Sequence, residues 1–253
     1  MNPSPLRTPF VSAHKRARIV KTLLVLGVIV TGLGILVEIT SLAFPLLTDE
    51  QEVGDNPVGT ALVLILFLFA IPDIVIYIST VVFFLMWLYR ASNNLRAFNP
   101  RSRLEYTATW AIGGFFIPFA NLIVPYRAIR EVWQKSATPD ESLGDPSPPA
   151  FFTIWWVFWL LASIAGNLSM RIAFDESVPV ENATIISIVT SALSILAAIF
   201  CYFVVDDIDS RQEETSRKLQ LEQLMTPPPP PPADVAMPEV VTPQSDPVNS
   251  PQV

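Results

Sequence analysis

The stretch ATIISIVTSALSILAAIFCYFVV, residues 183–205, decides the fold of this 253-residue chain, because it contains no charged side chain. A helix rises about 1.5 Å per residue, so about 20 apolar residues cross the hydrocarbon core of a bilayer. Inside hydrocarbon the backbone polar groups must pair within the segment, and a helix pairs them. The stretch therefore predicts a transmembrane helix.

Three other stretches have a similar length and apolar character: residues 19–47, 58–89 and 151–174. They are interrupted by Glu38, Asp73 and Arg171, respectively. None alternates apolar and polar residues with the period of two that strands show. The four stretches together predict an all-α integral membrane protein with four transmembrane helices, in a membrane domain that covers residues 19–209.

The composition narrows the classes of function. Only 15% of the residues are charged, and much of the acid behind the net charge of −7 lies in two short loops and the C-terminal tail. The acidity therefore does not indicate a basic partner, and we expect no nucleic acid. His14 is the only histidine and Cys201 the only cysteine. A histidine-based zinc site, a Ser-His-Asp triad and a Cys-His pair in the membrane are excluded, and we expect no catalytic residue, no cofactor, no metal and no enzymatic activity.

Residues 111–124 are apolar but short, and they contain Gly113, Gly114 and Pro118. A run of about 14 residues is typical of a re-entrant or interfacial segment. Arginines flank it on both sides, and a spanning helix would place one pair on the wrong side of the membrane. We expect a re-entrant or interfacial segment, although the sequence alone leaves a spanning helix open.

Residues 126–136 show the pattern of an amphipathic helix. One face carries Ile129, Val132, Trp133 and Ser136, and the other carries Arg127, Arg130, Glu131, Gln134 and Lys135. Such a helix lies along the headgroups of a membrane or packs on the surface of the bundle, and both alternatives stay open.

The two ends of the chain are polar. Residues 1–18 form a basic arm, and residues 210–224 are expected to continue the last helix because they contain neither Gly nor Pro. Residues 225–253 are rich in proline, with six in a row at 227–232, and predict a disordered tail. A proline run stiffens into a polyproline II rod that docks on aromatic grooves of a partner protein or serves as a spacer.

The positions of the Lys and Arg residues predict the orientation of the chain in the membrane. The loops at 48–57 and 175–182 carry acidic side chains and no base, and all but Arg171 of the 16 Lys and Arg residues lie on the other side. Because Lys and Arg accumulate on the cytoplasmic side, we expect a multi-pass protein of the cell (inner) membrane with both termini in the cytoplasm. Counting about 20 residues from the cytoplasmic side places Glu38, Asp73 and Arg171 at the outer boundary.

Those three charged residues form a candidate intramembrane cluster. We expect Arg171 to pair with Glu38, with Asp73 or with both, and so to fix the register of the helices. Two alternatives stay open: an outward-facing site for a cation or polar solute, and side chains that reach the headgroups without a partner.

Two strings carry a resemblance to a known family. They are YRASNNLRA at 89–97 and WAIGGFFIPFANL at 110–122, the latter continuing through PYR at 125–127 to REVW at 130–133. The chain resembles, over about residues 23–209, the bacterial membrane family called domain of unknown function 4328. The resemblance implies a multi-span bundle in a bacterial membrane and no particular activity.

Polar side chains in these strings suggest a structural role. A broken segment at membrane depth needs partners for its freed backbone groups. We expect the segment at 111–124 to receive them from Asn121 and from the neighbouring string, namely Arg90, Asn93, Asn94 and Arg96. The alternative is ordinary contact between the arginines and lipid headgroups.

These features favour a non-enzymatic membrane protein that organises or senses, with cytoplasmic arms for interaction. The alternative is a small-solute or ion transporter that uses the charges near the outer ends of the spans. Expected partners are the lipid bilayer and a cytoplasmic protein at the proline-rich tail. Self-association into a homo-oligomer stays open.

Overall fold

The computed structural model describes residues 9–43, 57–98, 103–137, 146–175 and 177–225, and these contain helices and no strands. Four helices are long and apolar enough to cross a membrane: α1 (His14–Ala43), α2 (Pro57–Phe98), α5 (Ala150–Ala173) and α6 (Val180–Met225). The all-helical class and the four long apolar helices are therefore confirmed. The predicted disordered tail and most of the acidic loop at 48–57 lie outside the described residues.

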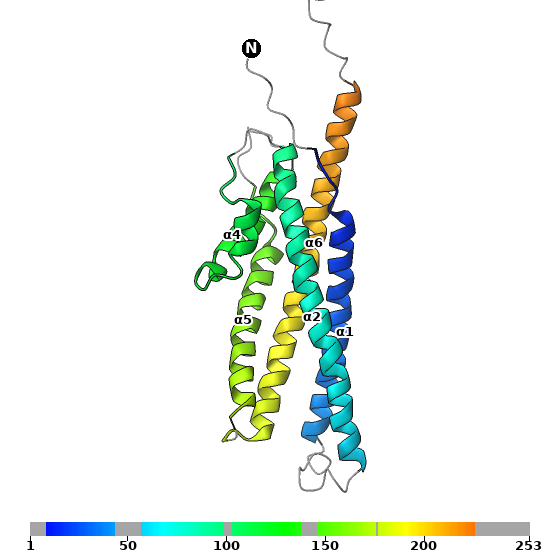
Figure 1. Cartoon of the computed structure of the whole chain (residues 1–253), viewed down its shortest axis with the longest axis vertical. Helices are drawn as coiled ribbons and strands as arrows, with labels where there is room; N and C mark the ends of the chain where they lie inside the picture. Colours follow the sequence, from blue (N-terminus) through cyan, green and yellow to red (C-terminus); the bar gives the residue numbers. More distant parts are fainter. Residues whose placement is uncertain (1–8, 44–56, 99–102, 138–145, 176, 226–253) are drawn as a thin grey trace, which may run out of the picture.

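The four long helices run side by side as an elongated bundle (Figure 1). Helix α6 packs along both α5 and α1, and α1 packs along α2, so α6 is the central element. Its last turns extend beyond the other helices. The helix is unbroken from the apolar stretch through the polar residues 210–224.

Besides α6, helices α1 and α2 also extend beyond one end of their apolar stretches. Helix α2 continues from Tyr89 to Phe98 because Ala91, Leu95 and Phe98, spaced by three or four residues, bury one face of this polar string. Helix α1 begins at His14 instead of Ile19, and Ala17 of this added turn is fully buried. The length of the apolar stretch underestimates the length of both helices, because the additional turns at their ends pack on other parts of the protein.

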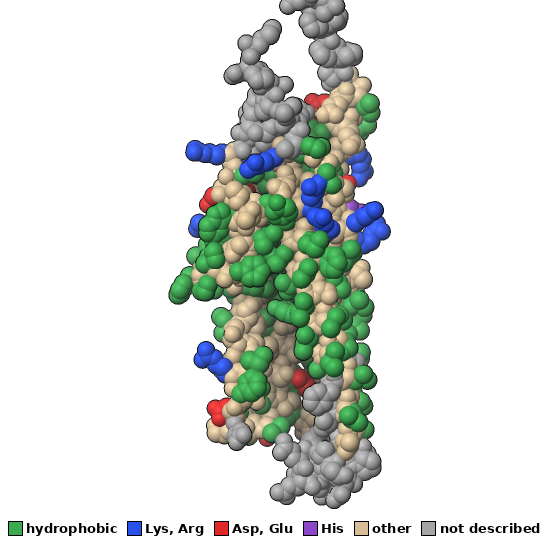
Figure 2. Space-filling view, viewed as in Figure 1, with side chains coloured by type: hydrophobic (Ala, Val, Ile, Leu, Met, Phe, Trp, Pro, Cys, Tyr) green, Lys and Arg blue, Asp and Glu red, His purple; other side chains and the backbone are tan. Residues whose placement is uncertain are grey.

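The bundle divides into two halves along its length. We call residues 9–24, 84–98, 103–137, 146–156 and 197–225 the basic half, because every described Lys and Arg except Arg171 lies there. The remainder, residues 25–43, 57–83, 157–175 and 177–196, is the far half. Figure 2 shows most of the Lys and Arg side chains of the visible face near one end, with hydrophobic side chains over much of the surface.

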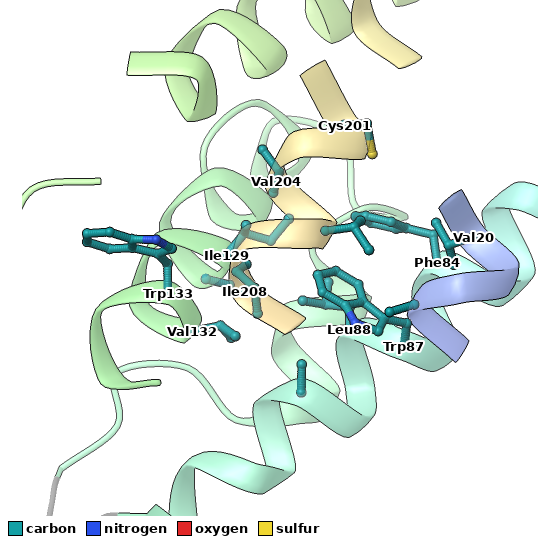
Figure 3. Packing of buried hydrophobic residues seen from close by; sticks show 14 of the residues in the cluster. Val20, Phe84, Trp87, Leu88, Ile129, Val132, Trp133, Cys201, Val204 and Ile208 are labelled. Atoms are coloured by element: carbon teal, nitrogen blue, oxygen red, sulfur yellow. The ribbon is translucent and has the colours of Figure 1, made fainter. Parts of the chain in front are cut away.

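The hydrophobic core belongs to the basic half. Side chains from α1, α2, α4 and α6 point toward one another there, and Trp87, Leu88, Ile129 and Val204 have no exposed surface (Figure 3). Among the far-half residues whose side chains are described, none is buried. The described structure therefore has one core, and it sits at the end where the charges gather.

The segment at 111–124 folds back on itself and does not form a spanning helix. Helix α3 (Ala108–Gly113) is followed by a turn, by the short 3-10 helix η2 (Ala120–Leu122) and by α4 (Val124–Lys135). A Cβ at Gly114 would lie 2.7 Å from Val124 Cγ1, so only glycine permits this close return. Phe119 at the tip has a φ of 62°, a strained value for a bulky residue.

Helix α4 is the predicted amphipathic helix. It buries Ala128, Ile129, Val132 and Trp133, whereas Arg127 and Arg130 are exposed. The buried face packs on α2 and α6, which favours a helix held on the bundle over one held by headgroups alone.

Candidate functional site at the basic end

Polar side chains are buried where α6 leaves the apolar stretch. On this helix Val205, Ile208, Asp209 and Gln212 are buried at spacings of three or four residues. The buried apolar face of α6 therefore continues on the same side of the helix as a buried polar face. A buried polar group is stable only when it is hydrogen-bonded, so each needs a partner from a neighbouring element.

Gln212 is the centre of this network, which we call the Gln212 network. Its Nε2 donates to Ala91 O at 2.9 Å and to Ser136 Oγ at 3.0 Å. Its Oε1 accepts from Asn94 Nδ2 at 3.1 Å. Ser136 Oγ in turn donates to Val132 O at 2.5 Å. One amide therefore joins α6 to α2 and to the end of α4.

Asn94 extends the network to the N-terminal arm. Its Nδ2 also donates to Val11 O at 3.1 Å, and its Oδ1 accepts from Val11 N at 3.4 Å. Arg90 Nε donates to the same Val11 carbonyl at 3.2 Å. Ser12 in the arm donates its hydroxyl to the Glu213 carboxylate on α6. The arm is thus hydrogen-bonded to two helices.

Two side-chain contacts connect α1 to α6 beside this network. His14 Nδ1 lies 2.7 Å from Asp209 Oδ2, and Lys21 Nζ lies 2.6 Å from Asp206 Oδ1. Arg18 Nη2 lies 3.1 Å from His14 Nε2, and a guanidinium can only donate. His14 Nε2 therefore accepts, and the neutral ring carries its proton on Nδ1 and donates it to Asp209.

Burial distinguishes the Asp209 carboxyl from its neighbours. Its side chain is only 4% exposed, whereas that of Asp206 is 48% exposed. Burial raises the pKa of Asp209, and the hydrogen bond from His14 lowers it in part.

A second contact fixes α4 against α6. Trp133 Nε1 donates to Asp207 Oδ2 at 2.5 Å, and the Arg211 guanidinium lies 3.9 Å from the centre of the Trp133 ring. Arg211 also pairs with Asp207 at 3.5 Å. A cation over an aromatic ring and a carboxylate at the ring edge match the electrostatics of an indole.

The predicted ion pairs of Arg171 are not formed with either carboxylate in the described part of the chain. Asp73 Oδ1 accepts a hydrogen bond from Thr31 Oγ1 at 2.9 Å, and Glu38 Oε1 accepts one from Ser187 Oγ at 2.7 Å. Arg171 is exposed near the end of α5, which packs on α6 and only slightly on the helices that carry the two acids. Hydroxyl groups on facing helices, not the arginine, meet the carboxylates.

The predicted polar support of the segment at 111–124 is also different in the structure. Arg90 and Asn94 bind the N-terminal arm and Gln212, as described above, and Oδ1 of Asn121 is buried without a partner among the described residues. No described hydrogen bond joins Asn93 or Arg96 to the segment. Both side chains lie on the same end of α2, Arg96 being exposed.

The folded-back segment satisfies its backbone mostly by itself. Short-range bonds such as Gly114 N to Trp110 O at 3.0 Å and Asn121 N to Ile117 O at 2.9 Å close its turns. One side chain from outside contributes, because Trp156 Nε1 donates to Leu122 O at 3.3 Å. Local turns therefore replace the distant polar partners that we expected.

Gln212 and the partners of Ser136, His14 and Lys21 were not predicted from the sequence. A signal was available, because polar residues continue the helical spacing of the apolar face of α6 beyond Val205. Asp209, Gln212, Thr215 and Ser216 occupy one buried face of that region.

Two shallow hollows open on the surface, one within the basic half and one at its border with the far half. One is lined by Arg16, Leu85, Met86, Tyr89 and Ile112. The other is lined by Arg18, Lys21, Thr22, Val25, Leu26 and Tyr202. Neither reaches the predicted intramembrane charges.

Comparison with known proteins gives one match. A family model described as domain of unknown function 4328 matches residues 57–210, more than half of the chain. The predicted resemblance is confirmed, although the match begins after α1 and ends before Gln212. No curated protein and no solved structure matches this chain.

Proposed function

The chain belongs to the family domain of unknown function 4328, and we propose that it is a non-enzymatic membrane protein that organises or senses through its cytoplasmic arms. The observation that carries this proposal is the Gln212 network. It fixes the N-terminal arm, α2 and α4 against the part of α6 that leaves the bundle. A helix held in this way presents its end in a defined direction.

Insertion in a membrane is supported by the surface of the far half. Leu36, Leu68, Ile71 and Ile164 are each at least 60% exposed, and many neighbouring apolar side chains are exposed with them. Such a surface is unfavourable in water and favourable against acyl chains. We place the basic half at the cytoplasmic face of the cell membrane because Lys and Arg accumulate there, so both termini are cytoplasmic.

The second candidate function is transport of a small solute or ion. One observation favours it: Oε2 of Glu38 is buried without a partner in the described part of the chain. A transport site would need a water-filled cavity at Glu38, Asp73 or Arg171, and the two hollows are lined by other residues. We therefore rank transport second.

The two candidates predict different results in liposomes. Under the organiser proposal, liposomes with the full chain take up cations no faster than empty ones. Under the transport alternative, uptake is rapid and the Glu38→Gln variant slows it, whereas the Ser169→Ala variant, changed at another polar residue of the far half, leaves it unchanged.

The organiser proposal is tested by its dependence on the tail. The full chain, a chain that lacks residues 225–253 and a chain with alanine at the six prolines of 227–232 are purified from native membranes in mild detergent. We expect a stoichiometric protein partner that both changed chains lose, while each still elutes as a folded bundle. Recovery of the same partners by the chain without the tail would contradict the proposal.

A further inference from the structure

The hollow between α1 and α6 has a graded lining. Arg18 and Lys21 lie toward the start of α1, and Thr22 follows at the next position. Val25 and Leu26 lie one turn further toward the far half, and Tyr202 of α6 forms the opposite wall. Cations at one end and apolar side chains at the other match a molecule with an anionic head and a hydrocarbon chain.

The cations keep donors available for such a head. Lys21 Nζ donates to Asp206 and lies 5.8 Å from the centre of the Tyr202 ring, which holds the ammonium in place. An ammonium has three N–H donors and a guanidinium five. The bonds to Asp206 and to His14 leave further donors on Lys21 and on the exposed Arg18.

In the proposed membrane placement, the hollow lies at the level of the lipid headgroups. Arg18 and Lys21 precede the uninterrupted apolar run of α1, whereas Val25 and Leu26 are inside it and are 48% and 44% exposed. Basic pockets between transmembrane helices on the cytoplasmic side bind anionic lipid heads.

We propose that this hollow binds one anionic phospholipid of the cytoplasmic leaflet, with its phosphate on Arg18 and Lys21 and an acyl chain along Val25 and Leu26. The proposal rests on the membrane placement given above and is independent of any protein partner of the tail. It assigns to α1 a role that the family match, which begins at residue 57, does not cover.

The test is native mass spectrometry of the full chain in detergent, titrated with phosphatidylglycerol or with phosphatidylcholine. We expect one phosphatidylglycerol to be retained per chain and to be preferred over phosphatidylcholine. The Arg18→Gln variant should weaken this binding about fivefold. The Val25→Trp variant, which fills the apolar part without a change of charge, should weaken it as well.

Lys15→Gln is the matched control, because Lys15 is an exposed cation of the same helix that does not line the hollow. It should retain the wild-type affinity. Equal losses in the Lys15→Gln and Arg18→Gln variants would overturn the proposal, because they would indicate general surface attraction. Equal binding of the two lipids, or displacement of the lipid by millimolar inorganic phosphate alone, would also overturn it. Loss of the tail partner without loss of the lipid would affect only the organiser proposal.

Discussion

The basic half and the far half share the same four long helices, to which the basic half adds α3, η2 and α4, but they are held together by different contacts. In the basic half, aromatic rings and aliphatic side chains are buried and polar groups form the Gln212 network. In the far half no described side chain is buried, and isolated hydroxyl–carboxylate bonds join the helices. Lipid is as apolar as leucine, so a helix surrounded by acyl chains gains little from burying its apolar face. The comparison indicates that the helices of this bundle are held to one another mainly at one end.

The largest effect should come from matched leucine truncations in the two halves. Leu88 is fully buried in the basic half, and Leu88→Ala should destabilise the bundle by about 2–5 kcal/mol because a cavity remains. Leu36 is 60% exposed in the far half, and Leu36→Ala should change the unfolding free energy by less than about 0.5 kcal/mol. Unfolding in mixed detergent micelles measures both. Equal losses would remove the distinction between the halves.

Removal of the central amide should have the next largest effect. Gln212→Leu leaves Ala91 O and the Asn94 amide without their buried partner, at a cost of about 2–3 kcal/mol. Gln220→Leu is the control, since Gln220 is exposed on the same helix. Protease sensitivity of the N-terminal arm should rise only in the first variant. An unchanged arm would contradict the assigned role of the network.

A smaller effect is expected in the pH dependence of stability, through the Asp209 carboxyl. Burial raises the pKa of Asp209, so the folded state binds this proton more tightly than the unfolded state. Stability should therefore fall as pH rises from about 4 through the raised pKa, because the buried carboxyl must then ionise. Asp209→Asn does not titrate, so its melting temperature should rise relative to the unchanged protein over that window. Parallel melting curves across pH 4 to pH 8 would contradict this account.

The smallest effect should come from a polar contact of the far half. Thr31→Val removes the hydrogen bond to Asp73 and should cost about 0.6 kcal/mol, the average for such bonds between membrane helices. Thr40→Val is the control, because among the described residues Thr40 bonds to Leu36 O of its own helix and to no other helix. A loss above about 2 kcal/mol in the Thr31→Val variant would show that the far half has a polar anchor of its own.

The helices could be predicted from the sequence, but the partners of the polar residues could not. Length and apolar character are properties of one segment, so the four long helices and the amphipathic α4 follow from composition and spacing. A partner depends on how two helices are rotated about their axes. Arg171 and Asn94 illustrate this. The carboxylates expected to pair with Arg171 bond to hydroxyl groups, and Asn94 bonds to the N-terminal arm and to Gln212 instead of the segment at 111–124.

The spacing of residues at the end of α6 also predicts which face of this polar region is buried. Asp209 and Gln212 continue the buried face at the helical period, and this pattern predicts packing even where the residues are polar. The partner atoms could still not be predicted, because Ala91 O is a backbone carbonyl and Ser136 lies just after α4.

The length of α6 determines where the tail begins. The helix continues from Val205 to Met225, and at about 1.5 Å per residue this carries its end about 30 Å beyond the apolar stretch. The potential of an anionic membrane surface decays over about 8 Å at physiological salt. If the bundle spans a membrane as proposed, the end of α6 lies several decay lengths away from the lipid charge, where repulsion from the membrane no longer opposes an approaching protein.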